Sequence, residues 1–189
     1  FIITRSELGG AQQFLARLLG GLDRQHYDCA VAAGGQGGNQ LKELLAPEIR
    51  YMTVPNLKRD TTIWSDIVSI LDIRRLILAE RPDVLFLISS KAGFVGSLAA
   101  RLARRRLPNM KVIYRIGGWT FNDPWSGPKR VFYTFLEKIS AGYKDYIIVN
   151  SEKDLHDAQR LGINPRKGLK LIHNGIDPYK LEFLPRDEA

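Results

Sequence analysis

The chain has 189 residues, enough for one domain with a sizeable core, and its 44% hydrophobic and 25% charged content excludes wholesale disorder. Its 28 Lys+Arg against 20 Asp+Glu give a net charge of +8, which suits nucleic acid, an anionic membrane surface or a phosphorylated ligand. The single cysteine, Cys29, excludes a zinc site built on cysteines, and no apolar run reaches the ~20 residues of a membrane-spanning helix.

Apolar runs and amphipathic stretches alternate along the first half of the chain. The apolar runs predict strands at residues 1–4, 27–33, 49–54 and 84–88. Amphipathic stretches between them predict helices at residues 11–22, 39–45 and 63–78. The strand at 84–88 is apolar throughout, as expected for a strand covered on both faces.

The same alternation continues in the second half. Ser89-Ser90-Lys91 opens a helix, in which glycines at 93 and 96 allow close packing. Further strands are predicted at residues 111–116, 146–149 and 169–172. Gly127-Pro128 starts another helix, and Ser151 with Asp154 fits a capping box for the last one.

The helix that starts at Gly127 has one apolar side, and we expect most of the aromatic residues in it to belong to the core. This apolar side comprises Val131, Phe132, Phe135, Leu136, Ile139 and Tyr143. The indoles of Trp119 and Trp125 lie in the preceding loop, so they are better candidates for an acceptor-binding or membrane-edge surface.

Strands joined by connections of helix length predict an α/β fold with a doubly wound, mostly parallel, Rossmann-like sheet flanked by helices. In such sheets the ligand lies beyond the carboxyl ends of the strands. Here those ends carry small or polar residues, as a binding crevice needs. They are Gly9-Gly10, Gly34-Gly35, Ser89-Ser90-Lys91, Gly117-Gly118 and Asn150-Ser151.

Gly9 and Gly10 stand between the first strand and the first helix. Adjacent glycines let backbone N–H groups approach a ligand, and the helix directs its positive end to the same place, which suits a phosphate or diphosphate. A tight turn without a ligand is the alternative. A nicotinamide-dinucleotide site is disfavoured, because no third glycine is in register and Gly34-Gly35 replaces the expected acid. No Walker-type loop is present.

Arg101, Arg104 and Arg105 are spaced to share one helix face. This face is either solvated or, together with Trp125, a contact for anionic lipid. No aromatic residues interleave with these arginines, so we expect no nucleic acid as a partner. The three histidines are scattered, and we expect no metal site.

Several stretches together resemble the N-terminal half of family-four glycosyltransferases, the retaining enzymes of GT-B fold, in particular those that build bacterial surface polysaccharides such as lipopolysaccharide. The stretches are ITRSELGGAQQFLARLL, ERPDVLFLISSKAGFVGSLAARLA, VIYRIGGWTF, YIIVNSEKDL and KLIHNGIDPYKLEF. They occur in the expected order. The chain departs from the family where relatives often carry histidine and this chain has Ile88 and Gly117.

This resemblance implies that Gly9 and Gly10 bind the donor diphosphate. It also implies an acceptor-side cleft formed by Ser90, Lys91, Gly117, Gly118 and Trp119, and it leaves the catalytic residue unassigned. The implied partners are a nucleotide sugar and a sugar or lipid-linked acceptor, without a metal or other cofactor.

The resemblance further implies an N-terminal, acceptor-side domain at 1–177, with 178–189 as a tail or linker towards a C-terminal donor-binding domain. We therefore expect this chain to be trimmed, inactive by itself, and cytoplasmic or peripheral on the inner face of the membrane. A non-catalytic Rossmann-type module that binds a nucleotide or phosphorylated sugar remains the alternative.

Overall fold

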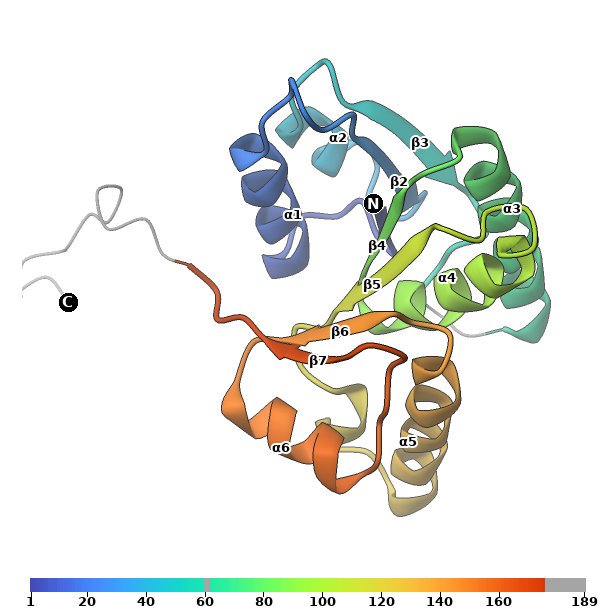
Figure 1. The fold of residues 1–189 in the computed structure, drawn as a ribbon, viewed down its shortest axis with the longest axis vertical. Coiled ribbons are helices and arrows are strands. Elements are labelled where there is room, and N and C mark those ends of the chain that lie inside the picture. The colour runs from blue at the N-terminus through green and yellow to red at the C-terminus, as the bar shows by residue number, and fades with distance from the viewer. Residues whose placement is uncertain (60–61, 176–189) are drawn as a thin grey trace, which may run out of the picture.

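The computed structural model describes residues 1–59 and 62–175 (Figure 1). In this part of the chain, seven parallel strands form one sheet in the order β3-β2-β1-β4-β5-β6-β7. The predicted doubly wound α/β fold is therefore confirmed. The predicted tail at 178–189 and its boundary after residue 177 lie outside the described residues.

The strands and helices alternate along the chain as the apolar pattern predicts. The strands are β1 (Ile2–Ile3), β2 (Ala30–Gly34), β3 (Arg50–Val54), β4 (Val84–Ile88), β5 (Lys111–Arg115), β6 (Tyr146–Val149) and β7 (Gly168–Leu171). The helices are α1 (Gly10–Gly21), α2 (Gln40–Leu44), α3 (Ile63–Glu80), α4 (Ser90–Ala103), the 3₁₀ turn η1 (Thr120–Asn122), α5 (Gly127–Ala141) and α6 (Glu152–Arg160).

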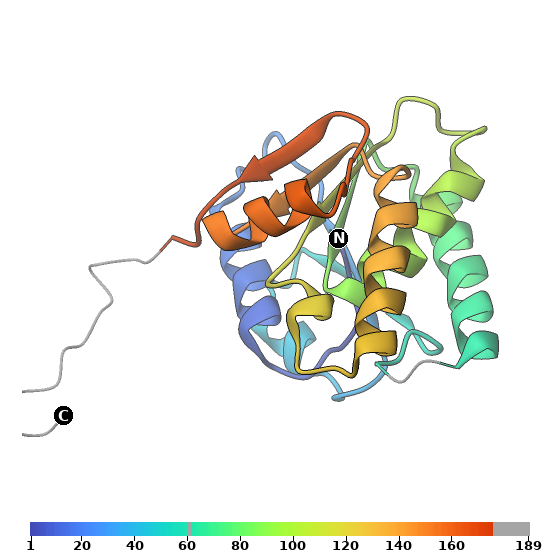
Figure 2. The same ribbon diagram turned by 90° about the horizontal axis from the view of Figure 1, so that it is seen from below.

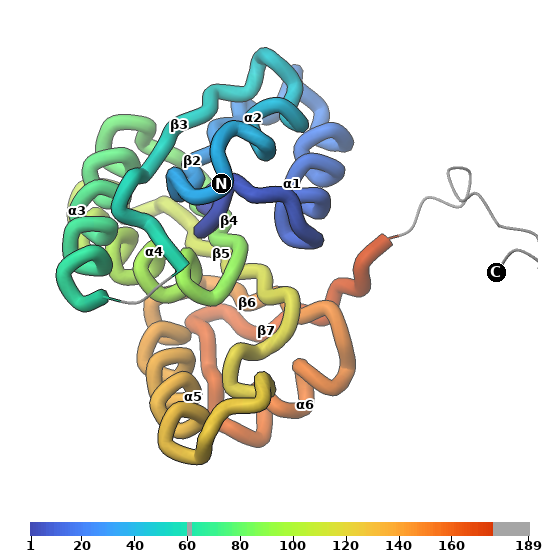
Figure 3. The backbone as a smooth tube through the Cα atoms, turned by 180° about the vertical axis from the view of Figure 1, so that it is seen from behind, coloured from blue at the N-terminus to red at the C-terminus, as the bar shows by residue number. Residues whose placement is uncertain are grey.

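The strand order reverses direction between β1 and β4, which pair with each other at the centre of the sheet (Figures 1 and 3). Because parallel crossovers are right-handed, this reversal sends the helices to two faces. Helices α1 and α2 cover one face, and α3 to α6 cover the other (Figure 1). Figure 2 shows α3, α4 and α5 side by side in that second layer.

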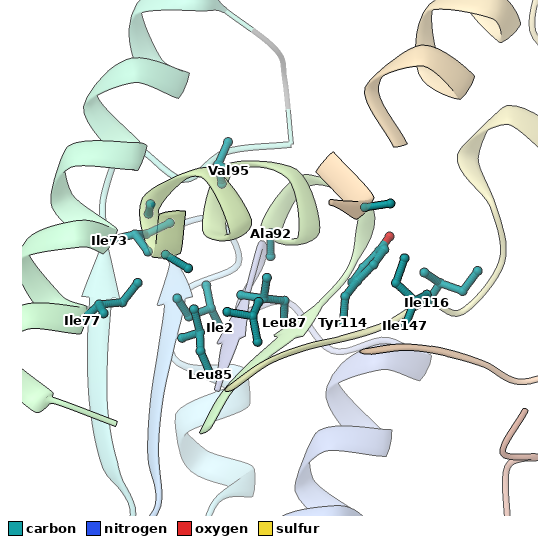
Figure 4. Close-up of a cluster of buried hydrophobic side chains, with 14 of the residues drawn as sticks. Ile2, Ile73, Ile77, Leu85, Leu87, Ala92, Val95, Tyr114, Ile116 and Ile147 are labelled. Carbon is teal, nitrogen blue, oxygen red and sulfur yellow. The ribbon is translucent and has the colours of Figure 1, made fainter. Parts of the chain in front are cut away.

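The larger core cluster lies between the sheet and the layer of α3 to α6. Leu85 and Leu87 of β4 point towards α4, where Ala92 faces Leu87, and Ile73 of α3 belongs to the same cluster (Figure 4). A second cluster, around Leu15, Leu19 and Val31, joins the sheet to α1 and α2. β4 is thus covered on both faces, as its uninterrupted apolar sequence predicts.

Helix α4 approaches the sheet closely because it carries glycine where it crosses β4 and β5. A Cβ atom added at Gly93 would lie 2.5 Å from Cε2 of Tyr114, and one added at Gly96 would lie 2.5 Å from Cδ2 of Leu87. The predicted close packing at these two glycines is confirmed. It places the first turn of α4 directly over the centre of the sheet.

Helix α5 differs from its prediction, because much of its apolar side points to solvent. Val131, Phe132, Phe135 and Ile139 are 69%, 52%, 57% and 44% exposed, so the prediction that this side is core was wrong. The buried side contains Glu137 instead, together with Ser140 and Ala141.

Lys144 explains why a glutamate can face the sheet. Its fully buried ammonium donates to Oε2 of Glu137 at 3.2 Å and to Oγ of Ser140 at 2.9 Å, and it lies 4.2 Å from the centre of the Tyr114 ring. Burial is the main cause that lowers the pKa of Lys144, and the charge of Glu137 opposes that effect. The buried side of α5 is therefore held by a compensated ionic contact.

We predict that Gly93→Ala destabilises the fold, because the Tyr114 ring is fully buried and its hydroxyl donates to Glu137. Overpacking of this kind costs about 1–3 kcal/mol, against a gain in helix propensity of about 1 kcal/mol. Urea unfolding of the variant checks this. Gly20→Ala is the control, because a Cβ there meets nothing within 4 Å and should leave stability unchanged or raised. Equal stability changes in the two variants would contradict the packing argument.

Candidate functional site

Two hydroxyl groups meet where the strand order reverses. Oγ1 of Thr4, directly after β1, lies 2.6 Å from Oγ of Ser89, directly after β4. The Thr4 hydroxyl also accepts a hydrogen bond of 3.2 Å from the backbone N–H of Ala92 in the first turn of α4. Thr4 thereby caps a helix that starts about 85 residues later in the chain. This switch point is where open parallel sheets bind their ligands.

Ser89 has a backbone conformation that serine rarely adopts, with φ 85° and ψ 149°. A side chain in this left-handed region costs of order 1–3 kcal/mol. The strained residue links β4 directly to α4, and its carbonyl accepts from the N–H of Gly93 at 2.8 Å. The strain is thus located at the turn that directs the N-terminus of α4 towards the switch point.

The loop after β1 is fixed by the loop after β2. The backbone N–H of Ser6 donates to the carbonyl of Gln36 at 2.9 Å, and the Ser6 carbonyl accepts from Leu41 at 2.9 Å. Gly37, with φ 95°, allows this approach, because a Cβ there would lie 2.3 Å from the backbone nitrogen of Glu7. Residues 4–9 are therefore held in place before any ligand binds.

Gly9 and Gly10 lie at the N-terminus of α1, as predicted. Gly9 is the N-cap residue, and no side chain caps the helix. A Cβ at Gly10 would meet nothing within 4 Å, so the space beside the first turn is open. The unpaired N–H groups of a first turn and its positive dipole end favour an anion. A diphosphate at these two glycines stays a prediction.

Gly34 has a different explanation from the predicted crevice. A Cβ at this position would lie 2.0 Å from the carbonyl oxygen of Leu57 and 2.1 Å from that of Thr4. The space beside Gly34 is therefore filled by protein backbone. Its glycine is required by packing at the end of β2 rather than by a ligand.

Ser90 and Lys91 lie in the first turn of α4, and both contact neighbouring elements. The Thr120 hydroxyl of η1 donates to Oγ of Ser90 at 2.6 Å. Lys91 forms an ion pair with Asp66 in the first turn of α3, and both side chains are largely buried. The charge of Lys91 is thus balanced within the protein. An acceptor contact by these two residues stays a prediction.

The loop after β5 contains exposed glycines and one buried indole. Gly117 and Gly118 are exposed, and Gly118 has φ 148°, which favours glycine. Trp119 is only 2% exposed, and its Nε1–H donates to the carbonyl of Asp154 at 2.8 Å. The prediction that the Trp119 indole offers a free surface was therefore wrong. It packs on Phe121 at 5.3 Å between ring centres and fixes the loop to α6.

Arg115 is a site residue that the sequence prediction missed. It ends β5 and is 6% exposed, and its guanidinium carbon lies 4.0 Å from the centre of the Phe14 ring in α1. Its Nη2 donates to the amide oxygen of Asn174 at 2.7 Å, a neutral partner that does not balance the charge. Burial lowers the pKa of Arg115. The available signal was one arginine at the carboxyl end of an otherwise largely apolar strand.

The site as a whole can attract an anion. The N-termini of α1 and α4 and the Arg115 guanidinium belong to the carboxyl ends of β1, β4 and β5, which are neighbours in the sheet. Within residues 1–59 and 62–175, no group of three or more His, Cys, Asp or Glu side chains is arranged to hold a metal ion. Helix N-termini and the Arg115 guanidinium are positive groups of the kind that bind anions.

The predicted membrane-contact arginines lie at the opposite edge of the sheet. Helix α4 ends at Ala103, and Arg104 and Arg105 lie in the turn that follows, yet Arg101, Arg104 and Arg105 line one depression of the surface, so the three arginines lie together as predicted. Arg104 donates to both carboxylate oxygens of Asp145, at 3.1 and 2.9 Å. Arg101 lies 4.9 Å from the Tyr143 ring centre. The Trp125 indole is half-buried and donates to the carbonyl of Thr120 at 2.9 Å.

A parallel sheet with helix N-termini at its switch point defines a Rossmann-like domain. Comparison with known proteins makes this assignment specific: Glycosyltransferase Family 4 matches residues 8–180. The chain belongs to this family. The match favours a glycosyltransferase domain over the non-catalytic binding module.

One curated relative is 27% identical over 172 residues, which cover 90% of this chain. It is the UDP-Gal:alpha-D-GlcNAc-diphosphoundecaprenol alpha-1,3-galactosyltransferase of Escherichia coli. The match spans 42% of the length of that enzyme. The predicted similarity to family-four glycosyltransferases of the bacterial surface-polysaccharide type is confirmed.

We predict an inverted order of stability at Ser89. Alanine normally exceeds glycine by about 0.4–1 kcal/mol, because glycine loses more backbone entropy on folding. At φ 85° alanine retains the strain that glycine avoids, so Ser89→Gly should be more stable than Ser89→Ala by about 1 kcal/mol. Urea unfolding measures both variants. The control pair is Ser90→Gly and Ser90→Ala, where alanine should be the more stable; the same order at both positions would contradict the strain.

Proposed function

We propose that this chain forms the N-terminal, acceptor-side domain of a glycosyltransferase that moves a sugar from a nucleotide-diphosphate donor to a sugar or lipid-linked acceptor in bacterial surface-polysaccharide synthesis. The family match over residues 8–180 is the observation that carries this proposal. The geometry of the switch point supports it, because the nucleotide-sugar donor of such a reaction carries a diphosphate group.

The chemistry assigned to the site is electrostatic. When the sugar leaves the donor, negative charge grows on the diphosphate, and preorganised positive groups stabilise that charge without rearranging. The first turn of α1 is open for this contact at Gly10, whereas the Gln12 side chain lies close beside Gly9. Arg115 supplies a charge beside α1, and Asn174, its hydrogen-bond partner among the described residues, is neutral. We assign these groups to the donor diphosphate.

The acceptor is assigned to the loops after β4 and β5. Gly117 and Gly118 leave space there, while Ser90, Lys91 and Trp119 shape the loop through contacts within the protein. The E. coli relative uses UDP-Gal and a GlcNAc-diphosphoundecaprenol, so a UDP-hexose and a lipid diphosphate sugar are the first substrates to test.

Further features of the reaction follow from the family resemblance and belong to the same proposal. Transfer retains the anomeric configuration, a second domain supplies most nucleotide contacts, and the 189-residue chain by itself does not turn over. No metal or other cofactor takes part. The enzyme acts at the inner face of the membrane, and none of the helices in the described part of the chain is both long and apolar enough to span a bilayer.

The first test is a transfer assay with the protein that contains this chain. A panel of radiolabelled nucleotide sugars is offered to a GlcNAc-diphospholipid acceptor, and we expect one donor to label the lipid product. Failure of every donor and acceptor pair, with folded protein, would contradict the proposed function.

Arg115→Gln should lower transfer by about 10- to 100-fold, because a charged hydrogen bond contributes about 1.5–3 kcal/mol. Arg17→Gln, which removes the same charge from an exposed position of α1, is the matched control and should retain full activity. If the Arg115 and Arg17 variants behave alike, Arg115 has no role in the site.

Removal of divalent metal gives an independent test. Because helix N-termini and Arg115 are proposed to stabilise the negative charge of the diphosphate, dialysis against EDTA should leave the transfer rate unchanged. A loss of activity that Mg²⁺ or Mn²⁺ restores would show that a metal ion carries out this task.

A further inference from the structure

The outer face of α5 is unusual for a helix in a water-exposed layer. Its exposed side carries the four large apolar residues Val131, Phe132, Phe135 and Ile139, while its buried side carries Glu137. A helix on the surface of a soluble domain ordinarily shows the reverse arrangement. The sequence pattern predicts that the apolar side of α5 faces the core, whereas in the structure that side faces solvent.

The four apolar residues form one continuous line along the helix. Val131 and Phe132 are adjacent, and Phe135 and Ile139 follow at intervals of three and four, so the four residues lie on one side of the helix; the same spacing continues to Gly142 and Tyr143 at the end of the helix. We call Val131, Phe132, Phe135 and Ile139 the α5 stripe. Four large apolar side chains in contact with water are a marker of an interaction surface.

The α5 stripe leads into a basic depression of about 630 Å³ between the ends of α4 and α5. Its lining includes Arg101, Arg105, Arg166 and Tyr143, together with Leu102, which is 53% exposed. The three arginines are exposed. Apolar side chains are thus followed directly by a positively charged hollow.

The charges around this surface have one sign. Lys129, Arg130 and Lys138 of α5 are exposed, and the only acid of that helix, Glu137, is buried against Lys144. Helix α4 contains no acidic residue. A surface with apolar side chains and exclusively basic neighbours on these two helices complements a partner that is apolar inside and anionic outside.

We propose that the α5 stripe and the basic depression dock the protein on an anionic phospholipid bilayer. The stripe enters the boundary between headgroups and acyl chains, and the depression binds a lipid phosphate. The contact deepens the proposed function, because a lipid-linked acceptor lies in such a bilayer. It refines the predicted membrane contact: Arg104 also lines the depression but is paired with Asp145, and the Trp125 indole donates to the carbonyl of Thr120.

The test measures co-sedimentation of the 189-residue chain with vesicles of phosphatidylcholine and phosphatidylglycerol, without sugar donor or acceptor. We expect binding to these vesicles and weaker binding to phosphatidylcholine alone. Phe132→Ser with Phe135→Ser should lower the bound fraction about tenfold or more, because both rings are exposed and neither supports the core. Arg101→Glu with Arg105→Glu should remove the preference for phosphatidylglycerol.

The matched control changes the same chemistry on the opposite face of the sheet. Tyr27→Ser with Arg17→Glu removes one exposed aromatic ring and reverses one exposed charge near α1, and should bind as the wild type does. Circular dichroism of each variant confirms its folding. The proposal would be overturned if the wild-type chain did not bind anionic vesicles, or if the Phe132→Ser, Phe135→Ser variant bound them as tightly as the wild type.

A second copy of the chain is the competing occupant of the surface. Sedimentation velocity of the chain without lipid distinguishes it: a dimer that the phenylalanine variant abolishes, without vesicle binding, would overturn the bilayer contact. Transfer to a water-soluble short-chain acceptor does not require a bilayer. Transfer activity in that assay without vesicle binding would reject the docking surface alone. Vesicle binding without transfer activity would reject the proposed function alone.

Discussion

The contact between the Thr4 and Ser89 hydroxyl groups joins the two halves of the sheet at its reversal point. Through it, the end of β1 caps the first turn of α4, and the strained Ser89 turn gives α4 its direction. Gly93 then allows the helix to lie close against Tyr114. The strained Ser89 backbone alone would destabilise the fold, and the hydrogen bonds and the glycine alone are ordinary features. Together they hold the N-termini of α1 and α4 at adjacent strand ends, which is the arrangement that an anionic ligand requires.

Positive side chains at the two ends of the strands lie in different environments. At the carboxyl ends of the strands, Arg115 is buried beside Phe14, so its charge acts in a medium that screens it weakly. At the far end of α4, Arg101 and Arg105 are exposed, so their attraction to a ligand depends on ionic strength. The first setting suits a substrate phosphate held at fixed distance, and the second suits a mobile lipid headgroup. The net charge of +8 alone does not reveal this division.

The order of strands and helices could be predicted from the sequence, because hydrophobic periodicity and the turn residues between elements are local signals. The uninterrupted run at β4, the Ser151 cap of α6 and the close packing at Gly93 were predicted and are confirmed, although the Asp154 carboxylate accepts from the Ser151 hydroxyl and not from its backbone N–H as in a full capping box. Residues whose role depends on distant contacts were not predictable in this way. Trp119 follows two glycines as an exposed loop residue would, yet α6 buries it. The α5 stripe has a core-like period, and only the buried Glu137–Lys144 pair shows that the other side of the helix faces the sheet.

A diphosphate bound at the switch point should be visible in amide chemical shifts of the ¹⁵N-labelled chain on titration with a short-chain GlcNAc diphospholipid and with UDP. We expect shifts at the amides of residues 9–12, 90–91 and 117–118, together with a shift of the Arg115 side-chain Nε–H. Shifts confined to residues 101–106 and 142–143, or none at saturating ligand, would contradict this expectation.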